Sequence, residues 1–143
     1  MPNLYKVIYF PIAIDDVNNI LNYISIDNPP VALELINKID TAISSLSQFP
    51  YKGVSPKDFH LKSKNYRMII VDSYIVFYIV NDIVSVIEIM RVLSSKQNYL
   101  SLLWTRSNTS SVYIIRKTYS ITYYFKDLFL HSESSIRFYP IPF

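Results

Sequence analysis

The sequence predicts an α+β fold, in which one antiparallel sheet packs against a two-helix hairpin in the order β-α-α-β-β-β-β. Three observations lead to this class. Residues 4–10 form an apolar run of strand length, residues 11–46 carry apolar residues at helical spacing, and residues 65–93 form three apolar runs separated by short polar turns. Because short connections join antiparallel neighbours, the last three strands should form a meander with the helical hairpin on one face.

The hairpin is predicted from the period of its apolar residues. Pro11 suits the first position of a helix, and Asp15 and Asp16 favour the start of that helix through its dipole. The helix should end at Asn28, before two prolines. Its buried face is marked by Val17, Ile20, Leu21 and Ile24, and that of the second helix by Ala32, Leu35, Ile36, Ile39, Ile43 and Leu46.

The strands are predicted from short apolar and β-branched runs. The polar pairs at 72–73 and 81–82 mark the turns between them. After a loop with Pro50, Gly53 and Pro56, we expect a brief strand at residues 59–62 and longer strands at residues 66–71, 74–80 and 83–93.

Residues 101–143 do not continue this plan, so we place one domain at residues 1–100 and an atypical extension at 101–143. Residues 112–115 and 120–125 could be two further strands. Three interpretations stay open for the extension: an added hairpin, a partner-binding segment, or a poorly ordered addition.

Composition excludes several classes of protein. The chain has no cysteine, which rules out disulfides and thiolate metal sites, and a single glycine, which rules out glycine-rich phosphate loops. The two histidines, His60 and His131, lack the spacing of a metal site, so we expect neither a metal nor a cofactor. No apolar run approaches the ~20 residues of a spanning helix, and we expect no secretory signal. We therefore expect a cytoplasmic protein with no membrane partner.

Two arginines, Arg67 and Arg91, lie inside otherwise apolar strands. A guanidinium stays charged at any working pH, so each needs an anion. One interpretation is a surface for a phosphate. The other is structural, with each arginine paired to a carboxylate such as Asp72 or Glu88.

A basic segment precedes the first of these arginines. Residues 52–67 contain five Lys or Arg residues against Asp58 alone, although the whole chain carries only +3. Lys57 and Lys64 are candidate RNA-binding residues. His60 and Lys62 would share one face of a strand. The plain alternative is a solvated loop with an ordinary histidine.

These groups suit metal-free RNA cleavage, which needs a base, stabilising cations and an acid. His60 or Lys62 would be the base, Arg67 and Arg91 the stabilising cations, and Tyr99 the acid or a base-stacking platform. Tyr99 could equally be a core aromatic near the sheet edge.

Four segments in this order carry a family resemblance: YKVIYFPIAIDDVNNILNYI, FPYKG, NYRMIIVDSYIVFYIV and EIMRVLSSKQNYL. Across residues 4–100 the chain resembles the RelE/ParE superfamily of bacterial type II toxins. The Phe49-Pro50 pair and the Arg91-Val92-Leu93 run are most similar to the ParE-like, plasmid-stabilisation branch.

The resemblance implies a compact toxin that a cognate antitoxin neutralises. RelE-like members cleave mRNA in the ribosomal A site, and Arg67, Arg91, Lys62 and Tyr99 fall at or near their functional positions. ParE-like members instead inhibit DNA gyrase. Ser94 stands where many relatives carry a histidine, which counts against a histidine-based nuclease.

We therefore expect a toxin that arrests growth by ribosome-dependent mRNA cleavage. The alternatives are a gyrase inhibitor without nuclease activity and an inactive toxin relative.

Overall fold

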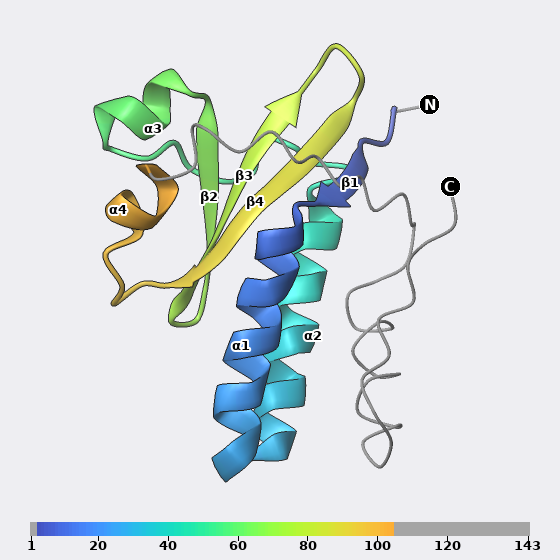
Figure 1. Ribbon diagram of the computed structural model, residues 1–143. Coiled ribbons are helices and arrows are strands. Elements are labelled where there is room, and N and C mark those ends of the chain that lie inside the picture. Colours follow the sequence, from blue (N-terminus) through green and yellow to red (C-terminus); the bar gives the residue numbers. More distant parts are fainter. Residues whose placement is uncertain (1–2, 105–143) are drawn as a thin grey trace.

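The computed structural model describes residues 3–104, which form eight elements (Figure 1). In chain order these are β1 (Lys6–Tyr9), α1 (Pro11–Asp27), α2 (Pro29–Ser45), α3 (Phe59–Ser63), β2 (Tyr66–Val71), β3 (Tyr74–Asn81), β4 (Val86–Ser94) and α4 (Tyr99–Trp104). The possible strands at 112–115 and 120–125 lie outside the described residues. No helix within residues 3–104 is long and apolar enough to cross a membrane.

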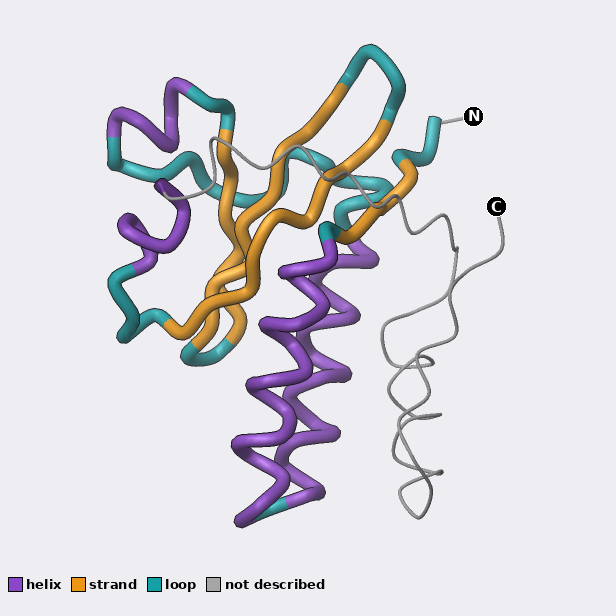
Figure 2. The backbone as a smooth tube through the Cα atoms, in the orientation of Figure 1, coloured by secondary structure: helices purple, strands orange, loops and turns teal. Residues whose placement is uncertain are grey.

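The predicted helical hairpin is confirmed, and Asn28 makes its turn. The backbone N–H of Asn28 donates to Ile24 O at 2.9 Å and ends α1, while its side-chain oxygen accepts from Val31 N at 3.3 Å and caps α2. Proline follows directly, where the first turn of a helix needs no N–H. The two helices therefore run back along each other (Figures 1 and 2).

The α+β class is confirmed, but the sheet is mixed rather than wholly antiparallel. Its strand order is β1-β4-β3-β2, with β2, β3 and β4 antiparallel to their neighbours in the meander. β1 pairs in parallel with β4, from Lys6 opposite Val86 to Tyr9 opposite Ile89. A parallel pair needs a long crossover, and the whole segment from α1 to β3 provides it.

Both faces of the sheet are covered (Figure 1). One face packs on α1 and α2 through a first core cluster that includes Val17, Ile36, Ile39, Tyr78 and Ile89. The opposite face packs on α3 and α4 through a second cluster that includes Leu61, Phe77, Leu93 and Leu103. Since consecutive residues of a strand point to opposite faces, Phe77 and Tyr78 belong to different cores.

The predicted strand at residues 59–62 is wrong, because these residues form the helix α3. The side chain of Asp58 accepts from Leu61 N at 3.0 Å and caps the helix, and Leu61 is buried. On a helical turn His60 and Lys62 do not share one face as they would on a strand.

Two predicted boundaries also shift. The last strand begins at Val86 rather than at residue 83, because the turn extends to Ser85, which has a positive φ of 52°. α4 spans the domain boundary that we placed at residue 100, and Leu103 is buried in the second core. The folded unit therefore continues into the segment that the sequence assigned to the extension.

Candidate functional site

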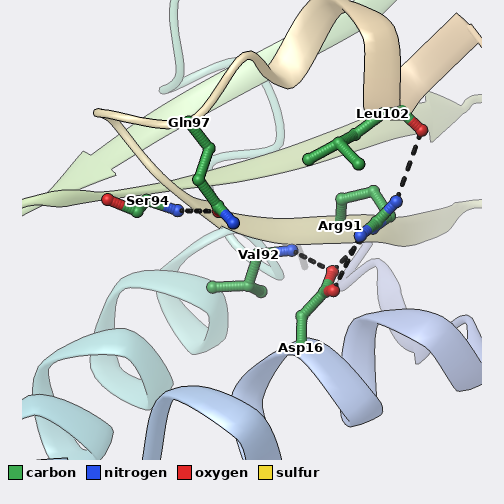
Figure 3. A network of polar contacts seen from close by, with 6 residues as sticks. All are labelled: Asp16, Arg91, Val92, Ser94, Gln97 and Leu102. Carbon is green, nitrogen blue, oxygen red and sulfur yellow. Dashed lines mark hydrogen bonds and ion pairs between the residues drawn. The ribbon is translucent and has the colours of Figure 1, made fainter. Parts of the chain in front are cut away.

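Arg91 forms a bidentate ion pair with Asp16 of α1 (Figure 3). Its Nε lies 2.7 Å from Asp16 Oδ2, and its Nη2 lies 2.8 Å from Asp16 Oδ1. Arg91 is only 8% exposed and Asp16 only 9%. Arg91 is therefore paired with a carboxylate, as the structural interpretation required, but the partner is neither Asp72 nor Glu88.

A β-bulge explains how Arg91 reaches this partner. Phe77 is opposite Arg91 and Tyr78 is opposite Ile89, so Met90 is the extra residue of β4. A bulge re-aims the neighbouring side chain. The third guanidinium nitrogen, Nη1, donates to the carbonyl of Leu102 in α4 at 3.3 Å. Arg91 thus joins α1, β4 and α4.

Asp16 also completes the edge of β4. Its Oδ2 accepts from Val92 N at 3.0 Å, just beyond the point where the pairing with β1 ends at Ile89. The carboxylate therefore supplies the acceptor that a longer β1 would have provided. This also corrects the assignment of Asp16 to the helix start, since it lies in the second turn of α1 and faces the core.

Arg67 contacts the loop after α2. Its Nη2 donates to Tyr51 O at 3.1 Å and to Gly53 O at 2.5 Å, and its guanidinium lies 5.2 Å from the centre of the Tyr51 ring. Arg67 Nε is buried without a hydrogen-bond partner. In the strand register Arg67 lies opposite Tyr78, which belongs to the first core, and Arg91 lies opposite Phe77, which belongs to the second. The two arginines are therefore on opposite faces of the sheet and do not converge.

The same loop is held by the buried hydroxyl of Tyr78. This hydroxyl donates to Pro50 O at 2.9 Å and accepts from Gly53 N at 3.0 Å. A Cβ on Gly53 would lie 2.6 Å from the Tyr78 hydroxyl and 2.7 Å from Met68 O, closer than side chains come. Gly53 is therefore needed for close packing, not for an unusual φ.

Asp82, in the turn between β3 and β4, accepts from two tyrosine hydroxyls. Tyr5 donates to Oδ1 at 2.8 Å and Tyr51 donates to Oδ2. The hydrogen bond from Tyr51, and then that from Tyr5, lowers the pKa of Asp82. The same carboxylate raises the pKa of Tyr51 to about 12. These contacts join the N-terminal segment, the loop after α2 and the turn before β4.

The remaining candidate residues lie around α3 and on α4. Lys57, His60, Lys62 and Lys64 are all exposed, and we call these four residues the α3 cationic surface. Tyr99 is partly buried in the second core, with its ring centre 5.3 Å from that of Phe77. Tyr99 therefore packs as a core aromatic on the α4 side of the sheet.

Taken together, the predicted site residues divide into three places. His60 and the three lysines gather around α3, Arg91 lies under α4, and Arg67 lies under the loop of residues 49–53. Within residues 3–104 no group of three or more His, Cys, Asp or Glu residues could hold a metal ion.

Sequence reasoning missed the roles of Asp16, Tyr51, Tyr78 and Asp82. One signal was available for Asp16: it precedes Val17 on the face predicted to be buried, and a buried carboxylate needs a cationic or N–H partner. The other three act through contacts between segments that are distant in the chain, and local spacing does not reveal such contacts.

Comparison with known proteins agrees with this fold. A family model described as "ParE toxin of type II toxin-antitoxin system, parDE" matches residues 7–99. Among solved structures, a chain of the chromosomal ParDE toxin-antitoxin system from P. aeruginosa aligns with a TM-score of 0.53 and 16% identity, covering 64% of this chain and 97% of that chain. A chain of the RelBE2 toxin-antitoxin complex from Mycobacterium tuberculosis aligns with a TM-score of 0.47 and 19% identity, covering 64% and 98%.

Curated protein sequences include no match. The family model covers β1 to the start of α4, and so nearly all of the described fold. The chain therefore belongs to the ParE toxin family of type II toxin-antitoxin systems.

Proposed function

We propose that this toxin arrests growth by binding a protein target, DNA gyrase, and not by cleaving RNA. The observation that carries the proposal is the commitment of both strand arginines to acceptors within the fold. Arg91 is bound on three nitrogens by Asp16 and the Leu102 carbonyl, and Arg67 is bound by two loop carbonyls. All three guanidinium nitrogens of Arg91 are therefore engaged, and Arg67 is held against the loop through Nη2, so the two cations are not directed at one phosphate.

The geometry of RNA cleavage supports the same choice. General acid-base catalysis and charge stabilisation require the base, the cations and the acid within hydrogen-bond reach of one scissile phosphate. Here the candidate cations contact different parts of the fold, and Tyr99 is packed against Phe77. Binding to a protein needs no such convergence.

We propose in addition that a cognate antitoxin neutralises the chain in the cytoplasm. The ParDE structure with a similar fold belongs to a toxin-antitoxin system, and the family model describes a toxin of such a system. The gene beside that of the toxin is the first candidate for the antitoxin.

Ribosome-dependent mRNA cleavage is the second candidate function. The observation that favours it is the α3 cationic surface, where three lysines and His60 are exposed around one short helix. Such a surface can bind phosphates through charge alone.

Two assays run in parallel on the purified full chain would test the proposal. In the first, gyrase supercoils a relaxed plasmid with increasing toxin, and in the second, an mRNA on programmed ribosomes is mapped for cuts. We expect inhibition of supercoiling with intact mRNA, and recovery of supercoiling when the neighbouring gene product is added. Cut mRNA with normal supercoiling would move the protein to the second candidate. If the chain neither inhibits supercoiling nor cuts mRNA, it is an inactive relative.

A further inference from the structure

The loop between α2 and α3 presents apolar side chains to solvent, although its backbone is firmly held. Phe49 is 61% exposed, Tyr51 is 51% exposed and Val54 is 55% exposed. Figure 2 traces this segment in teal between the two helices. Large apolar side chains that gather on a surface without joining the core are typical of an interaction site.

Polar contacts, and not the Phe49 ring, fix the backbone of this loop. The Tyr78 hydroxyl binds Pro50 O and Gly53 N, Arg67 binds the carbonyls of Tyr51 and Gly53, and Val54 pairs with Met68 through both its N–H and its carbonyl. Phe49 is thus not needed to hold the loop. Its ring is presented on a support that is already ordered before any partner arrives.

Two further segments bring apolar residues to the same end of the molecule. Tyr5 joins the loop through Ser47, since Tyr5 N donates to Ser47 O at 2.9 Å and Ser47 Oγ donates to Tyr5 O at 2.7 Å. Asp82 joins Tyr5 to Tyr51. Their neighbours Leu4 and Ile83 are 61% and 95% exposed. We call Leu4, Phe49, Tyr51, Lys52 and Ile83 the Phe49 surface.

Two cations and one carboxylate lie at this surface, which leaves its charge positive. Lys52 belongs to the surface, and the Arg67 guanidinium lies beneath the Tyr51 ring. The carboxylate is Asp82, and both of its oxygens already accept hydroxyl groups. Lys52 lines a shallow hollow together with Gln48, Phe49, Pro50 and Tyr51. A partner that fits this surface brings acidic groups to Lys52 and an apolar recess to Phe49.

We propose that the Phe49 surface is where this toxin contacts its protein target, and that the target presents an acidic rim around an apolar recess for the Phe49 ring. This inference rests on the proposed function, with gyrase as the target. Aromatic anchors carry a large share of the binding energy at protein interfaces. An anchor on a fixed loop also loses little conformational freedom on binding.

The first test compares two exposed phenylalanines in the full chain. Phe49→Ser removes the anchor, and Phe59→Ser is the matched control because Phe59 is 76% exposed on α3, outside the Phe49 surface. We expect Phe49→Ser to raise the Kd for purified gyrase about tenfold or more, and Phe59→Ser to change it less than about twofold. Both variants should unfold at the wild-type urea midpoint, since neither ring is in a core.

The second test reverses one charge. Lys52→Glu should weaken gyrase binding and should reduce its dependence on salt, whereas Lys96→Glu, at an exposed lysine in the turn before α4, should do neither. If wild type binds gyrase and Phe49→Ser binds equally well, the Phe49 surface is not the contact, while the proposed function stands. If wild type does not bind gyrase, gyrase is not the target, and the proposed contact between gyrase and the Phe49 surface is wrong as well.

Discussion

Asp16 and Arg91, which are 75 residues apart in the chain, form a buried ion pair in which two guanidinium nitrogens meet two carboxylate oxygens (Figure 3). The pair ties α1 to β4, and through the Leu102 carbonyl it also ties α4 to both. The two hydrogen bonds are parallel and charge-assisted, which is the strongest class of side-chain hydrogen bond. Because the pair lies between the two cores, we expect it to contribute strongly to the stability of this toxin.

Breaking this pair from one side should be strongly destabilising. Asp16→Asn keeps an acceptor for Val92 N but leaves the Arg91 charge without a counter-ion, and Arg91→Met leaves the carboxylate alone. Each should lower the free energy of unfolding by about 3–5 kcal/mol, because an unpaired buried charge remains. Urea unfolding of the purified chain measures this difference.

The double variant and a surface control complete that test. Asp16→Asn with Arg91→Met should cost clearly less than the sum of the single changes, since neither charge is then stranded. Lys38→Ala removes exposed contacts to Glu34 at 3.3 Å and Asp72 at 3.1 Å, and should cost less than about 1 kcal/mol. Additive losses in the double variant would show that the two residues do not act as a pair.

A methyl group at Gly53 should loosen the loop of residues 49–53. The Cβ of Gly53→Ala would lie 2.6 Å from the Tyr78 hydroxyl and 2.7 Å from Met68 O, and the second of these is backbone that cannot turn aside. We expect a loss of about 1–3 kcal/mol in the free energy of unfolding. Ser55→Ala, at an exposed position two residues after Gly53, is the control and should be near neutral. A Gly53→Ala variant as stable as wild type would mean that the loop is not packed this closely.

Most of the fold was predictable because its periodic patterns of apolar residues continue over many residues. Each helix of the hairpin spans several turns with a continuous buried face, and the meander strands alternate with clear turn residues. Residues 59–62 were assigned wrongly because only Leu61 of the five-residue helix α3 is buried, and one buried residue defines no period. The parallel partner of β1 was also hidden, since pairing between segments 80 residues apart leaves no local pattern.

The candidate site was less predictable because its contacts also join segments that are distant in the chain. The sequence indicated that Arg67 and Arg91 each need an anion. This holds for Arg91, although the sequence did not indicate Asp16 as its partner, whereas Arg67 is bound by the carbonyls of Tyr51 and Gly53. The bulge at Met90 decides which way Arg91 is directed, and no local signal marks it. Chemistry was readable from residue types, whereas the choice of partners required the fold.

Acid should weaken the contact between Asp82 and its two tyrosines. The hydrogen bonds from Tyr51 and Tyr5 hold the pKa of Asp82 below its ordinary value of 3.8. Because the pKa of Asp82 is lower in the folded chain, the ionised carboxylate stabilises the fold above pH 3.8. This stabilisation is lost as the pH falls through the pKa that Asp82 has in the folded chain. The difference in unfolding free energy between wild type and Asp82→Asn should therefore narrow as the pH is lowered from about 5 towards about 2.5.

The tyrosines provide the controls for this pH dependence. Tyr51→Phe removes the hydrogen bond that contributes most to the lowered pKa of Asp82. The difference in unfolding free energy between wild type and Tyr51→Phe should therefore also narrow as the pH is lowered. Tyr23→Phe changes an exposed tyrosine of α1 and should leave the pH profile as in wild type. A difference between wild type and Asp82→Asn that stays constant with pH would show that the carboxylate gains nothing from the two hydroxyls.

The α3 cationic surface should matter for RNA and not for gyrase. Changing Lys57, Lys62 and Lys64 together to Ala removes three exposed charges, so the salt dependence of binding to a single-stranded RNA should become shallower by roughly 0.7 in slope for each phosphate that the variant no longer neutralises. Inhibition of gyrase should stay within about twofold, because these lysines lie outside the Phe49 surface. The control changes Lys6, Lys38 and Lys96 to Ala, which removes the same charge from other exposed positions. If the α3 variant alone no longer arrests growth, and mRNA cleavage on ribosomes disappears with it, the toxin acts on RNA through α3 and the gyrase proposal is wrong.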